Sequence, residues 1–129
     1  MKNITLIFTL LFMPMLSSTS FAEWTKTYKS LDGRITYYLD FERIREVDEY
    51  VYFWSLYDLS TPDEYGDSSY KVYRQGDCNL FRYKILKEMY FIQKMGNGTH
   101  SSKTAENSKW NYPAPDSFNE HSLKQVCNR

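Results

Sequence analysis

The sequence has few of the residues on which most enzyme active sites depend. Its 129 residues include only two histidines and two cysteines. No H-E-x-x-H motif, no G-x-S-x-G motif and no glycine-rich phosphate loop is present. We therefore interpret His100 as a loop residue and His121 as a residue on a helix surface. We expect no catalytic residue and no cofactor.

An excess of charge of one sign is also lacking. The chain has 16 basic and 16 acidic residues, which argues against a protein held to nucleic acid by overall electrostatic attraction. The acidic residues Asp63, Glu64 and Asp67 resemble a set of calcium ligands, but they lack the spacing of a known calcium loop. A solvated acidic loop is the preferred interpretation, and no metal site is predicted.

Long apolar runs are absent after the first 22 residues. Residues 4–16 form a short apolar run, and Ser20 and Ala22 follow in an A-x-A-like pattern. This arrangement predicts a signal peptide over residues 1–22, because a membrane-spanning helix needs about 20 apolar residues. No cysteine near the expected cleavage point could carry a lipid. We expect an exported protein, periplasmic or secreted, without stable membrane insertion.

The remaining residues, 23–129, are predicted to form one domain. They number 107, with 15 basic and 16 acidic residues once Lys2 is removed. Export supplies oxidising conditions, so Cys78 and Cys127 are predicted to form a disulfide that closes a loop of about 50 residues. The alternative, a reactive Cys127 with His121 as its base, requires a free thiol in an oxidising compartment and is disfavoured.

Scarcity of glycine and proline, together with 18% aromatic residues, favours a β-rich domain. Alternating patterns predict strands, and polar residues at 100–107 form a loop or an edge strand. Asp116 or Ser117 is expected to cap a helix from Phe118 to about Cys127. We predict an α+β domain, in which five to six antiparallel strands precede one helix. The predicted strands cover residues 23–29, 35–40, 50–58, 69–75 and 80–91, with a brief extended piece around 45–47.

The order of landmarks along residues 23–127 resembles the surface-adhesin protein E-like family of Gram-negative envelope proteins. These landmarks are Trp24, Tyr37-Tyr38-Leu39-Asp40, Trp54-Ser55-Leu56-Tyr57-Asp58, Asp77-Cys78, Met95-Gly96-Asn97-Gly98, Trp110, Pro115 and Cys127. The resemblance implies an antiparallel sheet with a disulfide-tethered C-terminal helix. It also implies binding rather than chemistry, because the founding member is an adhesin for host matrix proteins. The sequence departs from a surface-anchored lipoprotein in lacking a lipobox cysteine.

Charge along the chain points to a binding surface. Residues 71–94 carry a local charge of +4, and residues 58–67 carry −4. Basic groups on adjacent strands are suited to a protein ligand or an anionic glycan, although they also protect sheet edges. An envelope subunit that self-associates as a homodimer and a small periplasmic enzyme are the alternative hypotheses. The predicted binding residues are Lys71, Arg74, Arg82, Lys84 and Lys87.

Overall fold

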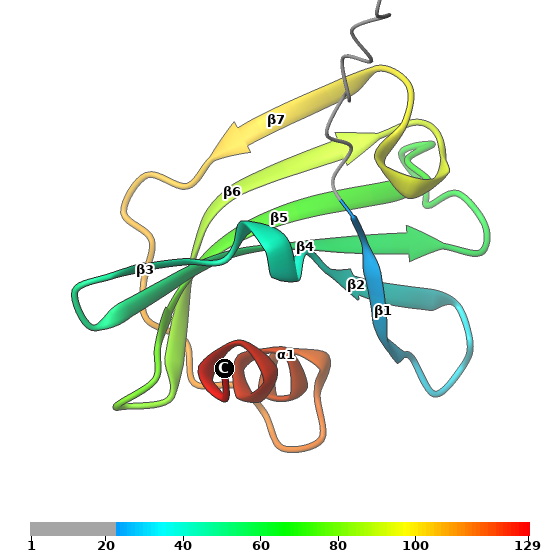
Figure 1. Cartoon of the computed structure of the whole chain (residues 1–129). Coiled ribbons are helices and arrows are strands. Elements are labelled where there is room, and N and C mark those ends of the chain that lie inside the picture. The colour runs from blue at the N-terminus through cyan, green and yellow to red at the C-terminus, as the bar shows by residue number, and fades with distance from the viewer. Residues whose placement is uncertain (1–22) are drawn as a thin grey trace, which may run out of the picture.

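The structure is a computed structural model that describes residues 23–129, and the predicted signal peptide lies outside the described residues. Seven strands form a single antiparallel sheet and one helix follows them, which confirms the predicted α+β class (Figure 1). The elements are β1 (Thr25–Lys29), β2 (Ile35–Leu39), η1 (Phe41–Arg43), β3 (Arg45–Val47), β4 (Tyr50–Leu59), β5 (Ser69–Asp77), β6 (Arg82–Phe91), η2 (Lys94–Gly96), β7 (His100–Thr104) and α1 (Phe118–Cys127).

Six of the strands follow the order β1-β2-β4-β5-β6-β7, and β3 pairs with β4 beside this path. The strands β2 and β3 occupy successive parts of one edge of β4. The first pairs with residues 55–59 and the second with residues 50–52, so η1 lies where the two meet. Residues 100–107 are predicted to form a loop or an edge strand, and the first five of them form the edge strand β7.

The strand β4 lies in the middle of the sheet, as its apolar sequence predicts. Val51 and Phe53 are buried against the helix, whereas the alternate residues Tyr52 and Trp54 are half-buried on the other face. Successive side chains of a strand point to opposite faces, so one strand contributes to two separate surfaces.

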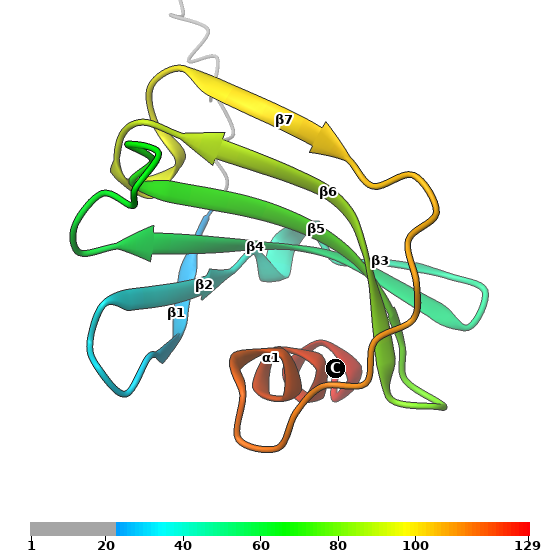
Figure 2. The same ribbon diagram turned by 180° about the vertical axis from the view of Figure 1, so that it is seen from behind.

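The helix α1 lies below the sheet in both views, between β1 and the lower ends of β5 and β6 (Figures 1 and 2). Its cap is Ser117, whose side chain accepts a hydrogen bond of 3.2 Å from the backbone N–H of Glu120. The apolar spacing of the helix predicts Phe118, Leu123, Val126 and Cys127 as its inward residues; the first three are buried and Cys127 is half-buried. The three buried residues pack with Leu39, Val51 and Phe53 to form the core.

Two features fix the helix close to the end of β5. The predicted disulfide joins Cys78 to Cys127, the last residue of α1. Gly76 lies beneath the helix, where an added Cβ atom would come within 2.8 Å of Val51 Cγ2 and 2.9 Å of Leu123 Cδ1. Glycine therefore permits an approach that any side chain at position 76 would obstruct.

Candidate functional site

The face of the sheet opposite α1 is called the open face. Its central part carries residues of β4, β5 and β6. The register places Trp54 beside Tyr73, Tyr73 beside Lys87, and Gln75 beside Lys84. Cross-strand partners share a face, so these side chains form one continuous surface.

Aromatic rings form the middle of the open face. The Trp54 and Tyr73 rings are stacked, with centroids 4.8 Å apart and planes inclined by 25°. Tyr52 extends the row, with its centroid 6.2 Å from that of Tyr73. All three side chains are half-buried. Stacking on the sheet holds these rings in place, which provides a pre-formed apolar surface.

Four of the five predicted binding residues lie on the open face. Lys84 and Lys87 share it although they are three residues apart, because a β-bulge interrupts the pairing of β5 and β6 beside Tyr73. Without that bulge, residues three apart on a strand would face opposite sides. Arg82 and Lys71 are the other two residues on this face, since they pair with Asp77 and Leu56 of the same surface.

The fifth predicted residue, Arg74, lies on the opposite face beneath α1. Its side chain is only 2% exposed. It donates a 2.5 Å hydrogen bond to the Ser55 hydroxyl and another to the Tyr57 hydroxyl. Its guanidinium group also lies 5.6 Å from the Tyr83 ring centroid and 5.9 Å from that of Phe118. Arg74 is therefore separated from the other four residues by the thickness of the sheet.

Trp110 covers one end of the basic surface. The Arg82 guanidinium carbon lies 4.2 Å from the centroid of the Trp110 ring, and the Lys84 ammonium nitrogen lies 4.6 Å from it. Both distances are within the range of cation–π interactions. Tyr50 contacts Trp110 from β4, at a centroid distance of 5.7 Å. The segment after β7 thus adds the Trp110 ring to the open face, a position that the local sequence did not indicate.

Asp77 is a buried residue that holds Arg82 in place at the end of the open face near Trp110. Burial raises the pKa of Asp77, but hydrogen bonds from the backbone N–H groups of Leu80 and Asn79 and from Arg82 outweigh burial, and the pKa is lower than usual. The ionised carboxylate therefore stabilises the fold above the ordinary carboxyl pKa. That stabilisation is lost as pH falls through the lowered pKa.

The variant Asp77→Asn should accordingly be less stable than the wild type at neutral pH. Their difference in free energy of unfolding should shrink between about pH 5 and pH 2. Urea unfolding at several pH values measures it, with Asp48→Asn, an exposed residue in the turn before β4, as the control. A difference that is constant over this range would contradict the role of the carboxylate charge.

An acidic groove lies at the far end of the helix-side face. It has a volume of about 580 Å³ and is lined by Asp63, Tyr65, Asp67, Tyr70, Tyr90 and Ser101. The Asp63 carboxylate already accepts hydrogen bonds from the backbone N–H groups of Tyr65 and Asp67 and from the Tyr70 hydroxyl. It shapes the loop. Within residues 23–129 no three His, Cys, Asp or Glu side chains come together in a way that could hold a metal ion.

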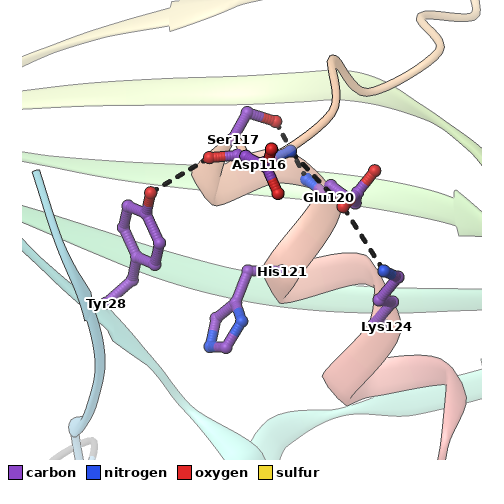
Figure 3. A pocket seen from close by; sticks show the side chains of 6 residues that line it. All are labelled: Tyr28, Asp116, Ser117, Glu120, His121 and Lys124. Carbon is purple, nitrogen blue, oxygen red and sulfur yellow. Dashed lines mark hydrogen bonds and ion pairs between the residues drawn. The ribbon is translucent and has the colours of Figure 1, made fainter.

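A further pocket of about 290 Å³ lies beside α1 (Figure 3). Its lining includes His121, whose Nε2 atom lies 3.0 Å from the backbone oxygen of Thr27. Tyr28 packs against the His121 ring at 5.5 Å, and its hydroxyl donates to the backbone oxygen of Asp116. His121 is half-buried and connects the helix to β1. The sequence analysis predicted it on the helix surface, so its position differs from that prediction. His100, predicted in a loop, lies exposed in β7 beside Phe91.

Comparisons with known proteins show which fold and which family the chain has. The structure is similar to crystal form II of Haemophilus influenzae protein E, with a TM-score of 0.63 and 16% identity over 81% of this chain and 87% of that one. Protein E from non-typeable Haemophilus influenzae gives a TM-score of 0.55 and 16% identity over 82% and 84%. At such identity the likeness shows the fold alone. A search of curated protein sequences finds no match. The model of the surface-adhesin protein E family matches residues 24–128, and the chain belongs to that family.

Proposed function

We propose that the protein is an exported, non-enzymatic binding module whose open face holds an anionic glycan or the acidic surface of a host protein. One observation carries this proposal: the stacked Trp54–Tyr73 pair lies beside Lys84 and Lys87 on a single face. An aromatic surface supplies contact area, and cations beside it attract an anionic partner.

The pairing of charges on the open face supports an anionic ligand. Asp77 is paired with Arg82, and Asp58 with Lys94. Among residues 23–129, Lys71, Lys84 and Lys87 form no ion pair with a carboxylate. Membership of a family of surface adhesins is consistent with a binding role. No helix within the described part of the chain is long and apolar enough to cross a membrane.

Reversing two lysine charges tests the proposal. The double variant Lys84→Glu/Lys87→Glu should associate on the order of tenfold more slowly with a heparin-derived oligosaccharide, because surface charges act mainly on the encounter rate. The matched control is Lys103→Glu/Lys124→Glu, which changes net charge equally. Lys124 lies on α1. Lys103 lies on β7, where its register partner on β6 is Glu88, a residue of the helix-side face. Surface plasmon resonance at several salt concentrations gives the rates.

The expected salt dependence is strong for the wild type. Charges are screened over about 8 Å at physiological ionic strength and about 3 Å at 1 M salt. Binding that survives both 1 M salt and the charge reversal would contradict an electrostatic site on the open face.

Export is the second part of the proposal. The N-terminal sequence of the protein recovered from a bacterial host should begin at Glu23, since Ser20 and Ala22 form the cleavage pattern. Its intact mass should contain no acyl group. A mass that includes residues 1–22, or a diacylglyceryl adduct, would contradict this prediction.

Self-association through the same aromatic face remains the alternative function. It requires the Trp54–Tyr73 surface to be covered by a second copy of the chain. Sedimentation equilibrium distinguishes the two hypotheses, because a protein that is monomeric at high micromolar concentration leaves this face free for another ligand.

A further inference from the structure

A row of tyrosines crosses the helix-side face of the sheet. Its members are register partners on neighbouring strands, namely Tyr28, Tyr37, Tyr57, Tyr70 and Tyr90. The centroids of successive rings in this tyrosine row lie between 4.8 and 6.3 Å apart. Cross-strand aromatic contacts of this kind stabilise a sheet and hold each ring in place. The row therefore presents a fixed aromatic surface wherever no other part of the chain covers it.

The helix α1 packs on one end of the tyrosine row. Its Phe118 ring stacks on Tyr37 at a centroid distance of 4.1 Å and contacts Tyr57 at 5.4 Å. The other end, Tyr70 and Tyr90, lines the acidic groove. The remaining walls of the groove come from the loop between β4 and β5 and from the start of β7, which lie at the same end of the sheet (Figure 1). At about 580 Å³, the groove has the size of a ligand site, for which volumes of about 300–1,000 Å³ are usual.

The groove contains a carboxylate that is not used by the fold. Within residues 23–129, the Asp67 carboxylate accepts no hydrogen bond and forms no ion pair. Burial and the hydrogen bond to Asp63 raise the pKa of Tyr70, and the hydrogen bond to Glu88 and burial raise that of Tyr90. The charge of Asp67 adds to both shifts, so its carboxylate lies near both hydroxyl groups.

The negative charge of the groove is not balanced by its own lining. Among the described residues that line it, two are acidic and none is basic. Lys103, the register partner of Glu88 on β7, forms no ion pair within the described part of the chain. Arg34 lines a neighbouring pocket with Asp63, but its ion pair is with Asp32, at 3.8 Å. The groove therefore attracts a cation.

Aromatic rings beside an unpaired carboxylate suit a flat organic cation. A guanidinium group is planar, stacks on aromatic faces and presents paired N–H donors that match a carboxylate, whereas an ammonium group is a compact point charge. Tyr65 adds a third ring at the rim, where it is 82% exposed. The groove is larger than one guanidinium group, which leaves room for the flanking backbone of a polypeptide.

We propose that the acidic groove binds the guanidinium group of an arginine side chain from a protein partner. The guanidinium group would donate hydrogen bonds to Asp67 and pack against the Tyr70 and Tyr90 rings. This second site goes beyond the proposed function, because it lies on the opposite face of the sheet from Lys84 and Lys87 and selects a ligand of the opposite charge.

Two peptides that differ only in charge provide the test. N-acetyl-glycyl-arginyl-glycinamide carries the guanidinium group, and its citrulline counterpart carries a neutral urea group of the same shape. In ¹⁵N-labelled protein, the arginine peptide at millimolar concentrations should shift the amide signals of Asp67 and Ser101 saturably. The indole signals of Trp54 and Trp110, on the open face, should not move. The citrulline peptide should bind at least about tenfold more weakly, because it lacks the charge-assisted hydrogen bonds.

The variant Asp67→Asn should weaken binding of the arginine peptide by about tenfold or more. The fold should tolerate this change, because the Asp67 carboxylate has no hydrogen bond or ion pair within residues 23–129. Glu64→Gln is the matched control. It removes the same charge from an exposed residue of the same loop that does not line the groove, and it should bind as the wild type does.

Four results would overturn the assignment. They are equal affinity for the arginine and citrulline peptides, equal affinity for a lysine peptide, an equal loss of affinity in the Asp67 and Glu64 variants, and signals of Asp67 and Ser101 that respond only to protein concentration. The last result would assign the groove to a second copy of the chain. Binding of the heparin-derived oligosaccharide through Lys84 and Lys87 is unaffected by each of them, so the two proposals fail separately.

Discussion

Removing the disulfide by the double change Cys78→Ala/Cys127→Ala should lower the free energy of unfolding by about 2–5 kcal/mol. The two cysteines are 49 residues apart in sequence, so the bond closes a long loop. In the chain-entropy model, a loop of this length corresponds to a stabilisation of about 4 kcal/mol. It also joins the end of α1 to the segment after β5. Urea unfolding at neutral pH measures the difference.

Reduction of the wild-type protein provides the control for that double variant. The reduced wild type and the alanine variant should unfold at closely similar urea concentrations, well below that of the oxidised protein. If the variant were as stable as the oxidised protein, packing of α1 alone would hold the helix, and the disulfide would have no stabilising role.

Leu123→Ala should lower the free energy of unfolding by about 2–5 kcal/mol, through lost apolar contacts and the cavity left behind. Leu123 of α1 is 1% exposed, and its side chain packs on β5 near Gly76. The same chemical change at Leu31 is the matched control, because Leu31 is 104% exposed in the turn between β1 and β2. There we expect a change within about 0.5 kcal/mol. Equal effects at both positions would contradict the described core.

Local patterns were sufficient to predict most of the fold. Alternating aromatic residues in β4 and the apolar spacing of α1 both express periods that a single sequence displays directly. The sequence predicts Asp116 or Ser117 as the cap of α1. Ser117 is the cap and has the extended backbone that this position requires, whereas Asp116 has a positive φ of 60°. The strand order could not be predicted, since β2 and β3 share one edge of β4 through contacts between distant residues.

The candidate site was predicted less completely, and the reasons differ by residue. Arg74 stands three positions after Lys71 on one strand, so the two-residue period alone could have placed them on opposite faces. Lys84 and Lys87 meet on one face only because of the β-bulge, for which the sequence carries no glycine or other evident signal. Trp110 joins the site through the path of the segment after β7, which depends on tertiary contacts rather than on local propensity.

Protection of lysines from chemical acetylation tests the central claim, that the open face is the binding surface. The protein is acetylated with and without a saturating heparin-derived oligosaccharide, and the modification at each lysine is measured by mass spectrometry. The account predicts strong protection of Lys84 and Lys87, and unchanged modification of Lys103 and Lys124, which lie on the helix side. Equal protection of all four lysines, or protection confined to Lys103 and Lys124, would contradict it.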